Sequence, residues 1–156
     1  MKLTKLTPNF SVKNVKDTIL FYRDILGFKL EMVVPKNKNI IEYNLADSET
    51  YSYAMMSKDE VFIMFIEENC FKKDIPLFKN TPQGASLLFY IDAEDIGTIY
   101  DSIKEKVEIV KDLETTWYGK KEFYIKDCNG YVLGFGENEQ SVQTGSEVKC
   151  YQKQVG

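Results

Sequence analysis

The stretch that decides the fold is Phe10-Ser-Val-Lys-Asn-Val-Lys-Asp-Thr-Ile-Leu-Phe-Tyr22, which is followed by Leu26-Gly-Phe28. A second stretch repeats its pattern, Phe89-Tyr-Ile-Asp-Ala-Glu-Asp-Ile-Gly-Thr-Ile-Tyr100. Each consists of a short apolar strand, a polar corner and a helix that carries an aromatic side chain. Because an internal repeat constrains architecture more firmly than local propensity does, the sequence predicts two similar structural units.

The first unit is predicted to contain one helix, over about 15–26. Asn14 can cap its start, Gly27 can end it, and apolar side chains recur on one face at Val15, Ile19, Tyr22 and Leu26. We expect strands at about 6–12, 28–34, 50–56 and 60–67, with a turn at Lys58-Asp59 and a further sheet contact from 40–45.

The second unit is predicted to repeat this plan. A helix is expected near 94–106, where Ile96, Ile99, Tyr100 and Ile103 share a face. Strands are expected at about 85–91, 107–112, 116–126 and 131–137. Asp127-Cys-Asn-Gly130 is a predicted hairpin turn, in which Asn-Gly supplies the positive φ angles.

The predicted fold class is α+β, with two βαβββ modules that form a curved mixed sheet, a half-barrel with a concave cleft. One helix can cover only one face of each sheet, so the other face is left for a ligand. The expected boundaries are a single domain over 1–137, module one at about 6–68, a linker at about 69–84, module two at about 85–137, and a polar C-terminal tail over 138–156.

Composition narrows the classes of function. The net charge of −4 argues against nucleic-acid binding, which needs a basic surface. No apolar window approaches the length of a membrane span, and the N-terminus lacks the apolar core of a signal peptide. The three cysteines, Cys70, Cys128 and Cys150, are odd in number and form no CxxC motif. They favour a reducing, cytoplasmic location over a disulfide framework.

Three motifs resemble the vicinal oxygen chelate superfamily, which includes glyoxalase I, extradiol dioxygenases and the fosfomycin and bleomycin resistance proteins. They are Phe21-Tyr-Arg-Asp-Ile-Leu-Gly-Phe28, Asp127-Cys-Asn-Gly-Tyr-Val-Leu-Gly-Phe135 and Trp117-Tyr-Gly-Lys-Lys-Glu-Phe123. The third is similar to a run typical of the bleomycin-resistance branch. Two residues depart from the family pattern, since Lys121 stands where arginine is usual and Cys128 where the hairpin proline is usual.

Metal-binding members of this superfamily take ligands from the first and last strands of each module. The resemblance carries those positions over to Thr7, Met64, Ser86 and Gly134. None of these residue types is a credible ligand for a divalent cation, and Glu68 would supply only a single carboxylate. The chain also contains no histidine, the commonest metal ligand and general base. The sequence therefore predicts neither a metal nor another cofactor, and no catalytic residue is assigned.

The predicted ligand-binding residues come from two regions. In the strand at 60–67, Phe62 and Met64 are expected to form an apolar floor, although an ordinary core stripe is an alternative. Gly134 and Gly136 share a strand face and leave space for a ligand, unless they mark only a bulge or curvature. Trp117 and Tyr118 could stack on a planar group or pack against a second subunit, and Glu122 could supply a polar contact.

These observations favour a metal-free binding protein of the bleomycin-resistance type. Such a protein would hold a bulky, partly aromatic small molecule in the cleft without changing its bonds. The resemblance also implies a homodimer, because such proteins often form their clefts between two subunits. Two alternatives are a lyase, isomerase or thiol transferase that uses Glu122 or tyrosines in acid–base chemistry, and a regulatory domain without a small ligand.

Overall fold

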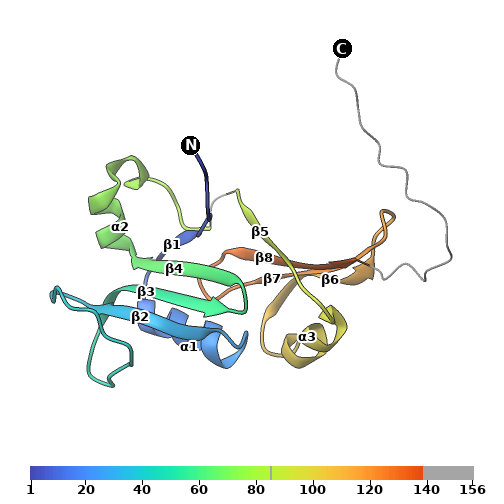
Figure 1. The fold of residues 1–156 in the computed structure, drawn as a ribbon, viewed down its shortest axis with the longest axis horizontal. Helices are drawn as coiled ribbons and strands as arrows, with labels where there is room; N and C mark the ends of the chain where they lie inside the picture. Colours follow the sequence, from blue (N-terminus) through green and yellow to red (C-terminus); the bar gives the residue numbers. More distant parts are fainter. Residues whose placement is uncertain (85, 139–156) are drawn as a thin grey trace, which may run out of the picture.

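The computed structural model describes residues 1–84 and 86–138, which form two successive units of the same plan (Figure 1). The first unit contains β1 (Asn9–Val12), α1 (Val15–Asp24), β2 (Lys29–Pro35), β3 (Tyr51–Lys58) and β4 (Val61–Glu67). The second contains β5 (Leu88–Asp92), α3 (Ile96–Ile103), β6 (Glu108–Thr115), β7 (Lys120–Lys126) and β8 (Val132–Asn138). The predicted α+β class and the repeated βαβββ modules are therefore confirmed.

Each unit forms a four-stranded mixed sheet. The strand orders are β1-β4-β3-β2 and β5-β8-β7-β6, so the first strand of each unit pairs in parallel with the last. The other pairs are antiparallel. Helices α1 and α3 both lie in the lower half of the view in Figure 1, each beside the sheet of its own unit. The same topology in both units follows from the sequence repeat.

The helices bury the apolar faces that their spacing predicts. In α1, Asn14 accepts a hydrogen bond from the Asp17 amide at 3.1 Å and so caps the helix. Val15, Ile19 and Tyr22 are fully covered, and they pack over the buried side of the first sheet, which includes Phe65. In α3, Ile96 and Ile103 are buried, whereas Ile99 and Tyr100 are partly covered.

The segment between the units is more ordered than the predicted linker. It contains α2 (Glu68–Asp74) and the short 3-10 helix η1 (Pro76–Phe78). The carboxylate of Glu67 accepts hydrogen bonds from the amides of Asn69 and Cys70, both at 3.1 Å, and thereby starts α2. Glutamate is an uncommon N-cap residue, which is why capping rules applied to the sequence did not locate this helix.

Three turns differ from their predictions. The β3–β4 turn lies at 59–60, one residue later than expected, with Asp59 at φ 51°. The strand predicted over 116–126 begins only at Lys120, because 116–119 form a turn with Gly119 at φ 79°. In the β7–β8 turn only Gly130 has a positive φ, 89°.

Two further predictions concern the edges of the fold. The 40–45 segment joins the first sheet only through an isolated bridge between Val33 and Glu42. Of the predicted tail, Asn138 belongs to β8, and 139–156, including Cys150, lie outside the described residues. No helix in the described part of the chain is long and apolar enough to cross a membrane.

Buried contacts join the two units. Tyr22 in α1 donates a 2.8 Å hydrogen bond to the carboxylate of Asp127 in the β7–β8 turn, 105 residues away. Phe10 of β1 packs against Phe89 of β5, with ring centroids 4.4 Å apart, and against Tyr131 at 4.8 Å. The Tyr131 hydroxyl in turn donates to the carbonyl of Ser11 at 2.8 Å. The interface between the units thus combines an aromatic core with buried hydrogen bonds.

Replacement of Tyr22 by phenylalanine tests the central hydrogen bond. We expect Tyr22→Phe to lower the free energy of unfolding by about 1.5–3 kcal/mol, because the Asp127 carboxylate loses a buried donor. Urea unfolding measures this change. Tyr100→Phe is the matched control, since Tyr100 donates to the exposed carboxylate of Asp112. Equal losses in the two variants would contradict the role assigned to the Tyr22 hydroxyl.

Candidate functional site

A buried carboxylate, Glu122, lies at the centre of the open face of the second sheet. Its side chain is in β7 on the face opposite α3, and the residue is only 2% exposed. Three tyrosine hydroxyls donate to it, from Tyr90 at 2.7 Å, Tyr118 at 2.9 Å and Tyr124 at 3.1 Å. The ammonium of Lys111 donates at 3.4 Å. We call these five residues the tyrosine–carboxylate cluster.

The cluster depends on two glycines in the central strand β8. In register across the sheet, Gly134 lies between Tyr90 and Tyr124, and Gly136 lies opposite Glu122. A Cβ atom at position 134 would lie 3.0 Å from the Tyr124 ring, and one at position 136 would overlap the Tyr90 hydroxyl. Side chains from the two neighbouring strands therefore meet above β8 only because it carries glycine there.

This arrangement corrects the interpretation that the glycines leave open space for a ligand. Tyr90 and Tyr124 occupy the space above Gly136 and Gly134. The reason is that the side-chain volume missing from β8 is supplied by longer side chains on β5 and β7. The glycines thus shape the surface indirectly, since they allow Tyr90 to reach Glu122.

The hydrogen bonds fix the protonation states of the cluster. Burial alone would raise the pKa of Glu122, but the donors Tyr90, Tyr118, Tyr124 and Lys111 outweigh it and hold that pKa below its usual value. Burial and the hydrogen bond to Glu122 raise the pKa of Tyr90 well above the ordinary range, and the same two causes raise the pKa of Tyr124. At neutral pH the carboxylate is therefore ionised and these two hydroxyls keep their protons.

An exposed aromatic side chain lies beside the cluster. Trp117, in the turn between β6 and β7, is 95% exposed. Its ring meets that of Tyr118 edge to face, with centroids 5.3 Å apart. Since Tyr118 donates to Glu122, the structure brings three of the predicted site residues, Trp117, Tyr118 and Glu122, into one connected group.

Phe62 and Met64 lie on the open face of the first sheet. They alternate in β4 with Ile63 and Phe65, which are buried on the side of α1, while Phe62 and Met64 stay partly exposed. The ammonium of Lys5 lies 3.0 Å from the centroid of the Phe62 ring. These two residues face away from α1, but they belong to a different sheet from Glu122, so the predicted site residues fall into two groups.

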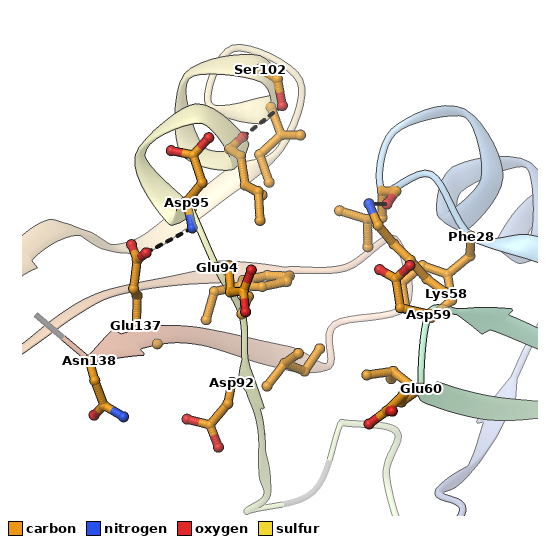
Figure 2. A pocket seen from close by; sticks show the side chains of 18 of the residues that line it. Phe28, Lys58, Asp59, Glu60, Asp92, Glu94, Asp95, Ser102, Glu137 and Asn138 are labelled. Carbon is orange, nitrogen blue, oxygen red and sulfur yellow. Dashed lines mark hydrogen bonds between the residues drawn. The ribbon is translucent and has the colours of Figure 1, made fainter. Parts of the chain in front are cut away.

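A groove of about 1230 Å³ lies between the two units (Figure 2). Figure 2 shows Lys58, Asp59 and Glu60 on the side of the first unit, with Glu94 and Glu137 on the side of the second. Its apolar lining includes the end of α1 and part of α3. Of the predicted site residues only Gly136 lines this groove.

Two of the polar side chains in the groove, Glu137 and Lys58, support the fold itself. Glu137 accepts hydrogen bonds from the amides of Asp95 and Ile96, at 2.8 and 3.3 Å, and so holds the start of α3 (Figure 2). Lys58 donates to the carbonyl of Leu26 at the end of α1, at 2.9 Å. Since these groups already serve helix ends, groove volume alone is weak support for a functional site.

The groove and the cluster meet at one ion pair. Lys120 and Asp92, which both line the groove, lie 2.8 Å apart. The Lys120 ammonium is also 5.2 Å from the centroid of the Tyr90 ring. Of the two places we take the cluster as the candidate site, because it gathers three tyrosine hydroxyls and an ammonium around one buried carboxylate, beside the exposed ring of Trp117.

The positions that hold metal in related proteins do not fit a metal here. Met64 and Gly134 lie in β4 and β8, while Thr7 and Ser86 precede β1 and β5. A thioether, a glycine and two hydroxyls supply neither imidazole nor negative charge. Within residues 1–84 and 86–138, no three cysteine, aspartate or glutamate side chains are grouped as a metal ion would require.

The site residues predicted from the sequence do not include Tyr90, Tyr124 and Lys111. A period-two rule places Tyr124 on the face of Glu122, and this signal was available within β7. Tyr90 and Lys111 lie on β5 and β6, whose register with β7 is set by strand pairing across the sheet. The sequence contains no local signal that these two side chains converge on Glu122.

Comparisons with known proteins agree with this fold. The sequence model of the Glyoxalase/Bleomycin resistance protein/Dioxygenase superfamily matches residues 6–135. No functionally curated protein matches the chain.

Three solved structures illustrate the likeness. A protein of unknown function from Agrobacterium tumefaciens str. C58 is 21% identical, with a TM-score of 0.64 over 89% of this chain and 97% of that one. A glyoxalase/bleomycin resistance protein/dioxygenase from Nocardioides is 12% identical, with a TM-score of 0.65 over 95% and 92%. TnmS3, an antibiotic binding protein from Streptomyces sp. CB03234, is 14% identical, with a TM-score of 0.62 over 89% and 99%. At these identities the likeness establishes the fold alone.

An alanine at position 136 tests how the cluster is built. We expect Gly136→Ala to displace the Tyr90 hydroxyl and to lower the free energy of unfolding by roughly 1–2 kcal/mol, because a hydrogen bond to a charged group is lost. Gly97→Ala is the control, since a Cβ there meets nothing within 4 Å and a helical glycine gains stability as alanine. Urea unfolding compares both variants. A Gly136→Ala protein as stable as the wild type would contradict the close approach of Tyr90.

Proposed function

The chain belongs to the Glyoxalase/Bleomycin resistance protein/Dioxygenase superfamily, and from that premise we propose that it is a metal-free protein that binds a bulky, partly aromatic small molecule. The tyrosine–carboxylate cluster and the adjoining Trp117 form its binding surface. The observation that carries the proposal is the gathering of three tyrosine hydroxyls around one buried carboxylate on an otherwise open sheet face. Phe62 and Met64 add an apolar surface on the other sheet.

Exposed aromatic area supports this proposal. Trp117 is 95% exposed, Tyr118 51% and Tyr90 39%, and all three adjoin the same carboxylate network. Aromatic side chains are large apolar surfaces whose faces stack on planar groups. Exposed apolar groups gathered in one place mark interaction sites more often than singly scattered ones do.

The electrostatics of Glu122 favour binding over acid–base catalysis. A general base works best when its pKa lies near the working pH, whereas the pKa of Glu122 is held below its usual value. Four donors also engage this carboxylate, three of them at Oε2. The raised pKa values of Tyr90 and Tyr124 make these hydroxyls weak proton donors. The cluster thus acts as a fixed polar surface, which argues against a lyase or isomerase that relies on these residues.

One relative supports a ligand of this class. TnmS3 is described as an antibiotic binding protein, and it shares the fold of this chain. A fold with an open sheet face can hold a small molecule without changing its bonds. Holding an antibiotic in this way would be enough to protect a cell from it. The proposed location is the cytoplasm, where the free thiols of Cys70 and Cys128 would stay reduced.

Binding of aromatic compounds provides the test. A panel of fused-ring aromatic drugs should contain compounds that raise the melting temperature of the wild-type protein. Trp117→Ala should weaken their binding by roughly 1–3 kcal/mol, the size expected for a lost aromatic anchor, as measured by calorimetric titration. Tyr43→Ala is the matched control, because Tyr43 is an exposed aromatic residue of the first unit. The proposal would be wrong if no compound of the panel stabilised the protein. It would also be wrong if the two variants bound the compounds with equal affinity.

We also propose a homodimer in which a second copy covers the open face of the first sheet. Phe62 and Met64, together with Met55 of β3, leave a partly exposed apolar surface on the first sheet. A closed two-fold pair would bury this surface and the sheet edges. Sedimentation equilibrium at micromolar concentration should give twice the chain mass of 18.1 kDa, and a monomer at every concentration would contradict the proposal.

A further inference from the structure

The directions of the hydrogen bonds in the cluster limit which ligands it can hold. A tyrosine hydroxyl has one hydrogen to donate. Tyr90, Tyr118 and Tyr124 each donate that hydrogen to Glu122. Toward a ligand, these three hydroxyls therefore present only lone pairs, and they can accept hydrogen bonds but not donate them.

The charge of Glu122 holds the hydroxyls in this orientation. Glu122 receives four donors, one at Oε1 from Tyr90 and three at Oε2 from Tyr118, Tyr124 and Lys111. To turn outward, a tyrosine would have to leave a buried, ionised acceptor without its donor, which is costly. The ionised carboxylate also polarises each O–H group, so that the phenol oxygens become better acceptors.

The ammonium groups nearby are already engaged with carboxylates. Lys111 lies 2.9 Å from Glu114 and 3.4 Å from Glu122, and Lys120 lies 2.8 Å from Asp92. Three carboxylates against two ammonium groups leave this network with one net negative charge. A ligand anion would thus meet an acceptor surface of its own sign, whereas a ligand cation would complement it.

The aromatic rings already accept cations. The Lys111 ammonium lies 5.0 Å from the centroid of the Tyr124 ring, and the Lys120 ammonium lies 5.2 Å from that of Tyr90. Both distances fall within the range of a cation–π contact. The exposed rings of Trp117 and Tyr118 offer the same negative π faces to a ligand. This observation is independent of the hydrogen-bond directions, and it points to the same kind of group.

From these directions and charges we infer that the site selects aromatic ligands that carry a protonated amine or a similar donor-rich cation, and discriminates against aromatic carboxylates. The inference rests on the proposed binding function and names its ligand class. The amine would donate to the tyrosine oxygens and lie over an aromatic face. The fused ring of such a ligand would stack beside Trp117.

Three matched probes test the inference on the full chain. They are 2-(1-naphthyl)ethylamine, which is protonated at neutral pH, 2-(1-naphthyl)ethanol and 1-naphthaleneacetate, compared by calorimetric titration. The amine should bind roughly tenfold more tightly than the alcohol, and the carboxylate should bind most weakly. The preference should shrink at high salt, because ions screen the charge of an open site.

Two variants test whether the preference for the amine depends on the orientation of the hydroxyls or only on nonspecific binding of aromatic compounds. Glu122→Gln removes the charge that fixes the hydroxyls, so the preference for the amine over the carboxylate should fall toward unity. Because Glu122 is buried and this variant can lose stability, Tyr118→Phe provides a second test at a half-exposed turn residue. Tyr118→Phe should weaken the binding of the amine several-fold and change the affinity for the alcohol less. Tyr43→Phe, at an exposed residue of the first unit, should change neither affinity.

The outcomes distinguish this inference from the proposed function. If the alcohol or carboxylate binds as tightly as the amine, and Trp117→Ala weakens that binding, the selectivity is refuted and the binding function stands. If the amine fails to bind a protein that fused-ring drugs stabilise, the inference is refuted in the same way. If no aromatic compound of either set binds, both are overturned.

Discussion

A buried hydrogen bond from Tyr22 to Asp127 couples the two halves of this protein. Asp127 is 5% exposed, and it also accepts hydrogen bonds from the amides of Asn129 and Tyr131. Burial raises the pKa of Asp127 even though these three donors lower it. The Asp127 carboxylate joins α1 of the first unit to the β7–β8 turn of the second. Loss of any of its hydrogen bonds would leave a buried polar group without a partner.

The contact between Tyr22 and Asp127 also positions the second sheet, which carries the tyrosine–carboxylate cluster. The β7–β8 turn joins the strand that carries Glu122 to the strand that carries Gly134 and Gly136. Because the aromatic contacts of Phe10 with Phe89 and Tyr131 lie beside the same turn, the second sheet is fixed against the first. The tyrosine–carboxylate cluster therefore lies on a strand pair whose connecting turn is packed against the first unit.

Two buried carboxylates of this protein also show how their surroundings set the direction of a pKa shift. Glu122 and Asp127 are both buried acids with several donors, yet the pKa of Glu122 is lowered while that of Asp127 is raised. At Glu122 the hydrogen bonds outweigh burial, and at Asp127 burial outweighs the hydrogen bonds. The first therefore carries its negative charge on the open face of the second sheet, whereas the second serves the contact between the units.

The sequence by itself determined the repeated βαβββ plan, the apolar face of α1 and the alternation in β4, because each depends on neighbours a few residues apart. It also identified Trp117, Tyr118 and Glu122, which lie within six residues of one another. Only the tertiary structure decided that Tyr90 and Lys111 reach Glu122, and that Gly134 and Gly136 are covered by tyrosines instead of open to a ligand. The physical reason is that strand register and the contact between sheets join residues far apart in the chain, and no local periodicity encodes which of them meet.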